Sequence, residues 1–274
     1  MAFGGGIYAT ASARVKVINS TISGNAARSV AGQASGGGIY AEGNGEAVEL
    51  IQSTVTDNEV SVTSGTNTRG GGVFGNVTAG NSLVAGNTST GDAADVSGNV
   101  VSRGHNLILN LDATATFSGD TTGNLTTLDP QLAPLGTYGG PTPTHALLPG
   151  SPAIDAGDNS LAVDENALPV TTDQRGAGFA RIVKGSRGSA TDTVDIGAFE
   201  LFAVPEFITD ELTLSIAAAP LDLIVATGVS PAGGVFSGPG VSGGFFDPRS
   251  QAPGNYTLTY TVTDAFGVSN ASSL

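Results

Sequence analysis

Four aspartates in the second half of the chain have carboxylate groups that could bind a metal ion or transfer a proton. They lie in three short segments: Asp155 and Asp158 in AIDAGD, Asp173 in DQRG and Asp195 in DIGAFE. Carboxylate oxygens from several loops suit calcium, which accepts irregular coordination, although the chain has no Asp-x-Asp-x-Asp-Gly loop. The alternative is a structural role, in which the carboxylates pair with nearby arginines and accept hydrogen bonds from loop amides. We favour the structural role.

The same segments also contain the side chains that acid–base chemistry on a polysaccharide needs. A glycoside hydrolase uses two carboxyl groups that flank the scissile bond, and a polysaccharide lyase uses an Arg or Lys as the base. Asp173 and Asp195 are the candidate carboxylates, and Arg181 and Lys184 are the candidate bases. An enzyme must bring these groups together in an open groove. We predict instead that the protein has no catalytic site, and we keep the hydrolase and the lyase as alternatives.

These residues must be positioned by a chain whose first hundred residues are repetitive. Two motifs recur together, and the first glycines of the GGG triplets are 32 and then 34 residues apart. The motifs are GGGIYA at 4–9 and 36–41 with GGGVF at 70–74, and NSTISGN at 19–25, QSTVTDN at 52–58 and NSLVAGN at 81–87. A repeat of this length is typical of a solenoid, a propeller or an array.

Within each unit the side chains alternate with the two-residue period of a β-strand. In VKVINSTI (15–22) β-branched residues dominate, and Gly and Asn mark the turns. The three- and four-residue spacing of an amphipathic helix is absent. Units of this kind bury little apolar surface alone and much against their neighbours. The sequence therefore predicts an all-β protein whose repeats stack as a right-handed parallel β-helix.

The repeated glycines and asparagines are expected to shape the turns of this stack. Glycine adopts positive φ and lets backbones approach closely, so the triplets at 4–6 and 36–38 are expected to form a corner. A nucleotide-binding loop would need a helix after the glycines, and IYATASARVKV is typical of strands. Asn25, Asn58 and Asn87 end the second motif at matching positions, and we expect them to form a hydrogen-bonded ladder along the stack.

Three aromatic residues occupy one position of the repeat. Tyr8, Tyr40 and Phe74 each follow an aliphatic residue, so one member of each pair must face outward. We predict that the rings stack as a column at the surface and that the aliphatic members face the core; these are Ile7, Ile39 and Val73. Exposed rings can serve as a platform for sugars, so this column is the candidate binding site of a carbohydrate-binding module.

The chain contains two histidines, His105 in SRGHNLI and His145 in PTHALL. Parallel β-helices are the usual scaffold of pectin-degrading enzymes, and SRGHNLI is similar to the Gly-His motif of polygalacturonases. The paired-aspartate motif of that family is missing, and RIVK (181–184) matches its Arg-Ile-Lys only approximately. His105 therefore has no acid to assist, and we expect both histidines to be hydrogen-bonded structural residues.

The composition excludes several classes of partner. The net charge is −14 and the pI is about 4.2, and no basic stripe is available to neutralise phosphates, so we predict no nucleic-acid partner. The absence of cysteine excludes disulfides and thiol catalysis. No apolar run reaches the roughly 20 residues of a spanning helix, so direct membrane insertion is not expected. No signal peptide is visible, and we interpret the sequence as a fragment of a longer secreted chain.

Residues 3–201 contain distinctive segments in a fixed order: GGGIYA, NSTISGN, GHNLI, GSPAIDAG, DQRG and DIGAFE. In this order they resemble the choice-of-anchor Q surface proteins, which are related in repeat style to the chlamydial polymorphic outer-membrane proteins. The resemblance implies a right-handed parallel β-helix that is secreted and often attached to the cell surface by a C-terminal anchor. It assigns no biochemical role. No anchor is visible in this sequence.

Changes in composition along the chain predict three regions. These are parallel β-helix coils at 1–110, irregular C-terminal coils and a cap at 111–203, and a further domain at 204–274. The last region has short alternating strands with frequent turn signals, which is typical of a β-sandwich. PGNYTLTYTVTD (253–264) looks like the tyrosine-corner region of a bacterial immunoglobulin-like domain, with Tyr256 as the corner residue. We predict a small, truncated immunoglobulin-like sandwich there.

Together these features predict a non-enzymatic extracellular surface protein or adhesin, in which a rigid rod presents long loops at 26–35 and 61–69 to a partner or matrix. The expected partners are an extracellular glycan or a surface protein, and a second copy of the chain bound through the uncapped N-terminal coil. No cofactor is required, and calcium is compatible with the aspartates. The alternatives are a polysaccharide-degrading enzyme and a carbohydrate-binding module without turnover.

Overall fold

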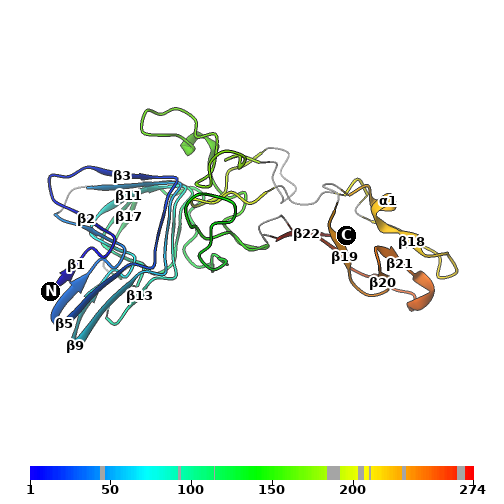
Figure 1. Cartoon of the computed structure of the whole chain (residues 1–274), viewed down its shortest axis with the longest axis horizontal. Helices are drawn as coiled ribbons and strands as arrows, with labels where there is room; N and C mark the ends of the chain where they lie inside the picture. The colour runs from blue at the N-terminus through cyan, green and yellow to red at the C-terminus, as the bar shows by residue number, and fades with distance from the viewer. Residues whose placement is uncertain are drawn as a thin grey trace. The chain divides into compact units, whose positions relative to one another are not determined.

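The structure is a computed structural model that describes residues 1–43, 47–91, 94–113, 115–183, 192–202, 207–209, 211–229, 233–263 and 269–274. The described chain divides into two compact units, one formed by residues 1–183 and 192–201 and the other by residues 202–274. Strands are the main regular secondary structure of both units, and the strands of the first unit pair in parallel (Figure 1). The all-β class predicted from the sequence is therefore confirmed.

The first unit contains four parallel sheets, and each of the three repeats contributes one strand to each sheet. Sheet A contains β1 (Ala2–Phe3), β5 (Ala26–Ser35), β9 (Glu59–Arg69) and β13 (Thr88–Ser89). Sheet B contains β2 (Ile7–Ala9), β6 (Ile39–Ala41), β10 (Val73–Phe74) and β14 (Val96–Ser97). Sheet C contains β3 (Val15–Ile18), β7 (Val48–Ile51), β11 (Val77–Gly80), β15 (Val100–Arg103) and β17 (Phe117–Asp120). Sheet D contains β4 (Thr21–Ser23), β8 (Thr54–Thr56), β12 (Leu83–Val84) and β16 (Leu107–Ile108).

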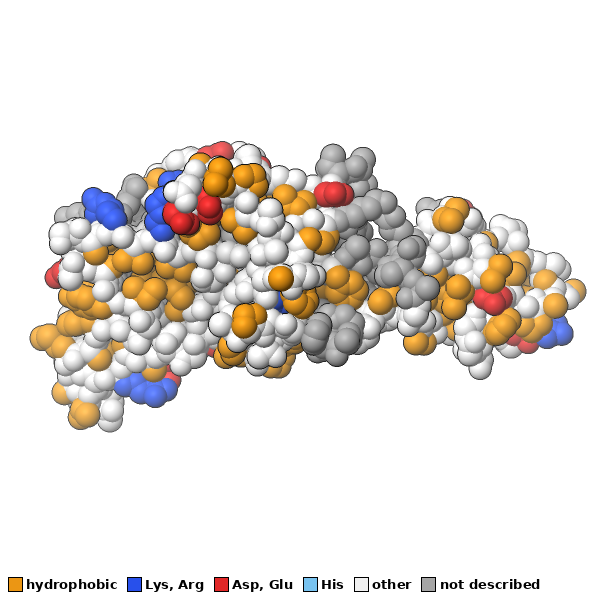
Figure 2. Space-filling model, turned by 45° about the horizontal axis from the view of Figure 1, so that its top comes forward, with side chains coloured by type: hydrophobic (Ala, Val, Ile, Leu, Met, Phe, Trp, Pro, Cys, Tyr) orange, Lys and Arg blue, Asp and Glu red, His pale blue; other side chains and the backbone are white. Residues whose placement is uncertain are grey.

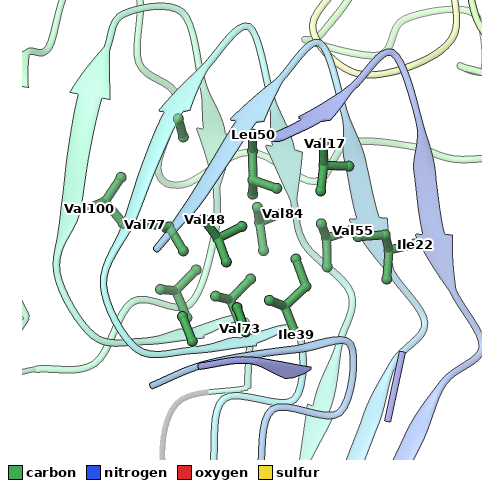
Figure 3. Close-up of a cluster of buried hydrophobic side chains, with 14 of the residues drawn as sticks. Val17, Ile22, Ile39, Val48, Leu50, Val55, Val73, Val77, Val84 and Val100 are labelled. Atoms are coloured by element: carbon green, nitrogen blue, oxygen red, sulfur yellow. The ribbon is translucent and has the colours of Figure 1, made fainter. Parts of the chain in front are cut away.

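The register of the sheets aligns equivalent residues of successive repeats. In sheet C, Val48 pairs with Val15 of the preceding strand and with Val77 of the following one. Their side chains meet others from sheets B and D in one interior cluster, which Figure 3 shows with Ile39 and Val84 among its fully buried members. Burying one such side chain is worth about 1.5 to 3 kcal/mol. The core is thus formed between repeats rather than within one repeat.

The glycine triplets form the corner between sheets A and B, as predicted. The first glycine of each triplet adopts positive φ, with values of 62°, 67° and 61° at Gly4, Gly36 and Gly70. The second glycine lies against the next repeat, because a Cβ atom on Gly37 would come within 2.4 Å of the carbonyl oxygen of Gly71. Successive repeats therefore approach each other too closely at this corner for a side chain to fit.

The asparagines that end the second motif form a hydrogen-bonded ladder, as predicted. The backbone N–H and Nδ2 of Asn25 both donate to Oδ1 of Asn58, and those of Asn58 both donate to Oδ1 of Asn87, at 2.9 to 3.0 Å. Asn87 donates the same two groups to Oδ1 of Asp95, at 2.9 Å each. Oδ2 of Asp95 accepts from the backbone N–H and Nδ2 of Asn110 at 3.0 Å. The direction of donation therefore reverses at Asp95.

The two segments predicted to be loops, at 26–35 and 61–69, are strands instead. β5 covers the first segment, β9 covers the second, and the two pair in parallel with a register shift between Ala31 and Gln33. Figure 1 shows them side by side in the first unit. Their Ser, Thr, Gly and Asn residues favour turns in isolation, but the next repeat satisfies their backbone groups. The loop prediction was wrong because the pairing partner is remote in the sequence.

A second column of turn residues lies at the corner between sheets C and D, and sequence analysis missed it. Asn19, Gln52, Asn81 and His105 adopt positive φ at matching positions, with values of 50°, 48°, 48° and 54°. This left-handed conformation is uncommon outside glycine, although Asn and His adopt it more readily than most residues. Four successive turns therefore have the same corner geometry. The motif was interpreted as part of a strand because the residues on both sides alternate.

After β17, the first unit continues with mostly irregular chain that contains isolated β-bridges and one 3₁₀ helix (Asn159–Leu161). This segment lies along the outer side of sheet D. The hydroxyl groups of Thr21 in β4 and Thr144 are 2.7 Å apart, and Oγ1 of Thr54 in β8 accepts from the backbone N–H of Ala198 at 3.0 Å. The segments that carry the four aspartates are thus held against the stacked sheets.

The second unit contains two three-stranded antiparallel sheets. One is formed by β18 (Leu221–Asp222), β21 (Phe245–Phe246) and β20 (Val241–Ser242), and the other by β19 (Val235–Ser237), β22 (Thr259–Thr263) and β23 (Ser269–Ser273). The unit also contains helix α1 (Leu223–Thr227) and a 3₁₀ helix (Pro248–Ser250). Leu223, Phe236 and Tyr260 belong to its separate core. The hydroxyl of Tyr256 donates to the carbonyl of Ala252 at 2.5 Å and so fixes the turn before β22.

Candidate functional site

Five charged side chains form a buried network in the first unit: Asp173, Arg175, Arg181, Asp195 and Glu200. Arg175 lies between two aromatic rings, with its guanidinium carbon 4.0 Å from the ring centroid of Phe179 and 3.8 Å from that of Phe199. Its Nε and Nη2 donate to Oδ2 of Asp173 at 2.9 and 2.6 Å. Nη2 also donates to the carbonyl of Glu200 at 2.6 Å. Both members of the ion pair are buried, so each has the partner that a buried charge requires.

Asp195 ties the adjoining loops together. Its Oδ1 accepts from the backbone N–H of Asp155 at 2.8 Å, and its Oδ2 accepts from that of Leu201 at 2.7 Å. Oε2 of Glu200 accepts from the backbone N–H of Asp195 at 2.9 Å. Burial raises the pKa of Asp195 to about 7 and raises the pKa of Glu200 well above its ordinary value. These carboxyl groups therefore connect backbone segments away from solvent.

Arg181 completes the network from the other side. It is fully buried, and its Nη2 donates to the carbonyl groups of Asp195 and Gly197 at 2.9 and 2.6 Å. Burial lowers the pKa of Arg181, whereas the nearby carboxyl groups of Glu200 and Asp195 raise it. Within the described residues, Nε and Nη1 have no hydrogen-bond partner. The contacts match the structural role that we favoured, in which the aspartates hold arginines and loop amides.

The structure does not bring the catalytic candidates together in an open groove. Asp173, Arg181 and Asp195 are at most 1% exposed. A polysaccharide cannot exchange a proton with a carboxyl group that has no exposed surface. The fourth candidate, Lys184, lies outside the described residues.

The remaining two aspartates of the metal hypothesis also serve the backbone. Asp158 caps the 3₁₀ helix, because its Oδ1 accepts from the backbone N–H of Ser160 at 2.8 Å. Asp155 adopts positive φ, at 51°, in the turn that meets Asp195. In the part of the chain that the structure describes, no group of three or more His, Cys, Asp or Glu side chains is arranged to hold a metal ion. Calcium binding stays a prediction.

Both histidines are hydrogen-bonded, as predicted. Nδ1 of His105 lies 2.7 Å from the carbonyl oxygen of Ala156, and Nδ1 of His145 lies 2.9 Å from that of Ala133. Nε2 of His145 lies 2.8 Å from the hydroxyl of Ser23. Each histidine thus links the irregular segment or its turn to the stacked sheets.

The aromatic column lies on sheet B, where Tyr8, Tyr40 and Phe74 pair in register. Neighbouring ring centroids are 5.0 Å apart at each step, with interplanar angles of 2° and 20°. The aliphatic partners face the core as predicted; they are Ile7, Ile39 and Val73. Tyr8 is 48% exposed. Because the rings stack face to face, the faces of Tyr40 are covered by its neighbours, and a sugar can stack only at an end of the column.

A cavity of about 400 Å³ adjoins the column at Phe74. Its polar lining comes from different turns and sheets, and sequence analysis missed it because most of these residues lie outside the repeated motifs. The lining side chains with polar groups are Arg69, Ser97, Asn99 and Asp112. A second cavity, of about 330 Å³, lies within the second unit and has a mixed polar and apolar lining that includes Leu214, Phe246 and Tyr256.

Charged side chains are sparse on the face of the molecule that Figure 2 shows. Figure 2 shows hydrophobic side chains gathered on the repeats of the first unit, with small separate groups of acidic and basic side chains. A saccharide needs apolar surface with a few polar groups beside it, whereas a polyanion needs an extended basic surface. The face in view has apolar surface with a few polar groups rather than an extended basic surface.

No protein-family model matches the chain, and neither the curated proteins nor the solved structures contain a match. The α-helix that the structure describes has five residues, too few to cross a bilayer. The described architecture defines an all-β protein that combines a stack of parallel sheets with a small antiparallel unit.

Proposed function

We propose that this protein is a non-enzymatic surface or adhesin-like protein of the cell exterior, in which a right-handed parallel β-helix presents one face to a glycan or to another surface protein. One observation carries the proposal: the two candidate carboxylates, Asp173 and Asp195, are buried and already bonded. Asp173 is paired with Arg175, and Asp195 accepts from loop amides. Groups held in this way stabilise a fold rather than transfer protons to a substrate.

Three features of the first unit support the β-helix. The chain visits sheets B, C, D and A in turn before it returns to sheet B. Glycine corners recur with the same φ, and the asparagine ladder links successive repeats. In such a solenoid each repeat is supported by its neighbours, so surface side chains keep a fixed spacing. Fixed spacing suits presentation to a partner.

We also propose that the second unit is a small immunoglobulin-like domain that acts as a spacer. Its two antiparallel sheets support this assignment. The hydrogen bond from Tyr256 to the carbonyl four residues earlier is of the kind that a tyrosine corner makes.

The test of the non-enzymatic proposal is a digest of neutral and acidic polysaccharides with the purified chain, with and without calcium. New chain ends are counted over hours, and circular dichroism confirms that the protein is folded. We expect no new ends under any condition. New ends in any digest would refute the proposal and make Asp173, Arg181 and Asp195 the first residues to substitute.

The extracellular location has its own test. A protease added to intact cells that produce the protein should degrade it, while a cytoplasmic marker in the same cells stays intact. Protection of the protein until the cells are lysed would contradict the proposed location.

A second candidate function is carbohydrate binding without turnover. The observation that favours it is the cavity of about 400 Å³ at the end of a column of stacked rings. This arrangement places an apolar ring face beside polar side chains, as small-molecule sites do.

A further inference from the structure

The ring column on sheet B stops one strand before the sheet does. Strand β14 follows β10 in the sheet, and its Ser97 pairs in register with Phe74. Serine has no ring, so the stack does not continue beyond Phe74 on the side away from Tyr40. Each ring of the column lies 5.0 Å from the next. The position beyond Phe74 in the column is therefore taken by Ser97, a small side chain that is only 5% exposed.

A cavity adjoins the column at this position. Its volume is about 400 Å³, and Phe74 and Ser97 both line it. The residues that follow them in the two strands, Gly75 and Gly98, also line it and contribute no side chain. Cavities of roughly 300 to 1,000 Å³ are typical of small-molecule sites. A single sugar ring therefore fits the volume of this cavity.

Polar and charged groups surround this space. Arg69, at the end of β9, is exposed and lines the cavity together with Asn99 and Asp112. Oδ2 of Asp112 accepts from the hydroxyl of Ser97 at 3.2 Å. A guanidinium group donates several hydrogen bonds, and a carboxylate accepts from hydroxyl groups. One positive and one negative side chain give the cavity little net charge, which favours a neutral ligand.

We propose that this cavity binds one neutral pyranose ring of a saccharide, with the apolar face of the sugar stacked on Phe74 and its hydroxyl groups bonded to Arg69 and Asp112. The inference rests on the proposed presentation function and makes it specific, because the glycan is recognised through one sugar rather than along the whole column. A nucleobase also has a flat ring, but the net charge of −14 opposes a nucleic acid.

The test is a titration of the whole chain with one methyl pyranoside at a time, in which saturation-transfer NMR detects binding. The neutral probes are the methyl glycosides of glucose, galactose, mannose and N-acetylglucosamine. The methyl glycoside of galacturonic acid, with its carboxylate free, tests an acidic sugar. Adenosine tests a nucleobase. We expect at least one neutral pyranoside to bind with a Kd of about 1 mM, as a single small ring in an open site does.

Three variants locate the site. Ser97→Phe supplies the missing ring of the column and should abolish binding, because the new side chain fills the cavity. Phe74→Ala removes the stacking face and should weaken binding by about tenfold or more. Tyr8→Ala is the matched control, since it removes a ring of the same column away from the cavity and should change the Kd by less than about twofold.

Three results would overturn the proposal: no saturation transfer to any neutral pyranoside, equal binding by the wild type and Ser97→Phe, or a preference for adenosine or galacturonate. If Phe74→Ala does not fold, Ser97→Phe still decides. The digest described above detects turnover independently of this titration. If the titration detects no binding, the non-enzymatic proposal is unaffected. If the digest produces new chain ends, the result of the titration is unaffected.

Discussion

The hydrogen-bonded ladder between the repeats depends on one carboxylate. Asp95 is fully buried, and its two oxygen atoms accept two hydrogen bonds each, from Asn87 on one side and from Asn110 on the other. A side-chain amide has one acceptor oxygen and one donor nitrogen. Asp95→Asn therefore keeps the shape of the side chain but directs an NH₂ group at two N–H donors. The substitution tests the hydrogen bonding with almost no change in volume.

The expected cost follows from the bonds that are lost. Two of the four hydrogen bonds disappear, and each hydrogen bond to a charged group is worth about 1.5 to 3 kcal/mol, or about 3 to 6 kcal/mol together. Part of this cost is offset, because burial raises the pKa of Asp95 and so already disfavours its ionised form. We expect the free energy of unfolding of the first unit to fall by about 2 to 4 kcal/mol.

The assay is urea unfolding of the whole chain, with hydrogen exchange of residues 19–110 to report on the first unit separately from the second. The control is Asp129→Asn, which removes the same charge from an exposed side chain that accepts a bond from the backbone N–H of Gln131. The control should change the stability by less than about 0.5 kcal/mol. Equal stability of the two variants would refute the reasoning.

A double substitution tests the direction of the ladder itself. Asn110→Asp alone places a carboxylate against Asp95 and should destabilise the first unit by like-charge repulsion. In the double variant Asp95→Asn/Asn110→Asp, the amide at position 95 donates to the carboxylate at position 110, and the ladder runs in one direction. The double variant should therefore be more stable than the sum of the two single effects predicts. Additive losses would contradict the proposed polarity.

Three further variants test the loop network and the glycine corner. Because burial raises the pKa of Asp195 to about 7, the folded state keeps a proton that the unfolded chain releases near pH 4. This stabilisation is complete below about pH 4 and falls by about 4 kcal/mol as the pH rises to about 7. Thermal melts should show the fall, and Asp195→Asn should make the profile shallower while the slope from the raised pKa of Glu200 remains. Gly37→Ala places a Cβ atom 2.3 Å from the Glu59 carbonyl oxygen and should lower the free energy of unfolding by more than about 3 kcal/mol. Gly24→Ala, with open space around it, should lower it by about 1 kcal/mol. Equal losses in urea unfolding would contradict the close approach. Arg175→Lys loses the paired hydrogen bonds to Asp173 and the stacking on two aromatic rings, and should lower the free energy of unfolding by about 2 to 3 kcal/mol in the same assay. A variant as stable as the wild type would count against the network.

The features that the sequence predicted are those that the repeats determine locally. The glycine triplets, the asparagine ladder and the outward rings each occupy one repeat position, so stacking brings like residues together without any further information. Tyr40 illustrates this, because its neighbours in space are its counterparts in the adjacent repeats. The pairing of Asp173 with Arg175 was predictable for a similar reason, since the two residues are close in sequence.

The features that were missed depend on contacts between unrelated segments. Arg69 and Asp112 meet at one cavity, although no shared motif connects them. Glu200 joins the buried network only because the irregular segment folds back on itself, which periodicity does not encode. The strands at 26–35 and 61–69 were mistaken for loops because their composition favours turns, while pairing with the next repeat outweighs that local preference.

The direction of the asparagine ladder determines where the stack of repeats in the first unit can gain or lose a repeat. Asn25, Asn58 and Asn87 all donate the same way along the chain, so a unit duplicated between two of them finds an acceptor on one side and a donor on the other. Asp95 accepts from both sides and ends this series. Gene duplication or loss of an internal unit therefore preserves the ladder, whereas a unit added beyond Asp95 needs an acceptor of its own. Repeats can therefore be gained or lost before this carboxylate without a change in the direction of the ladder, whereas beyond it the direction is reversed.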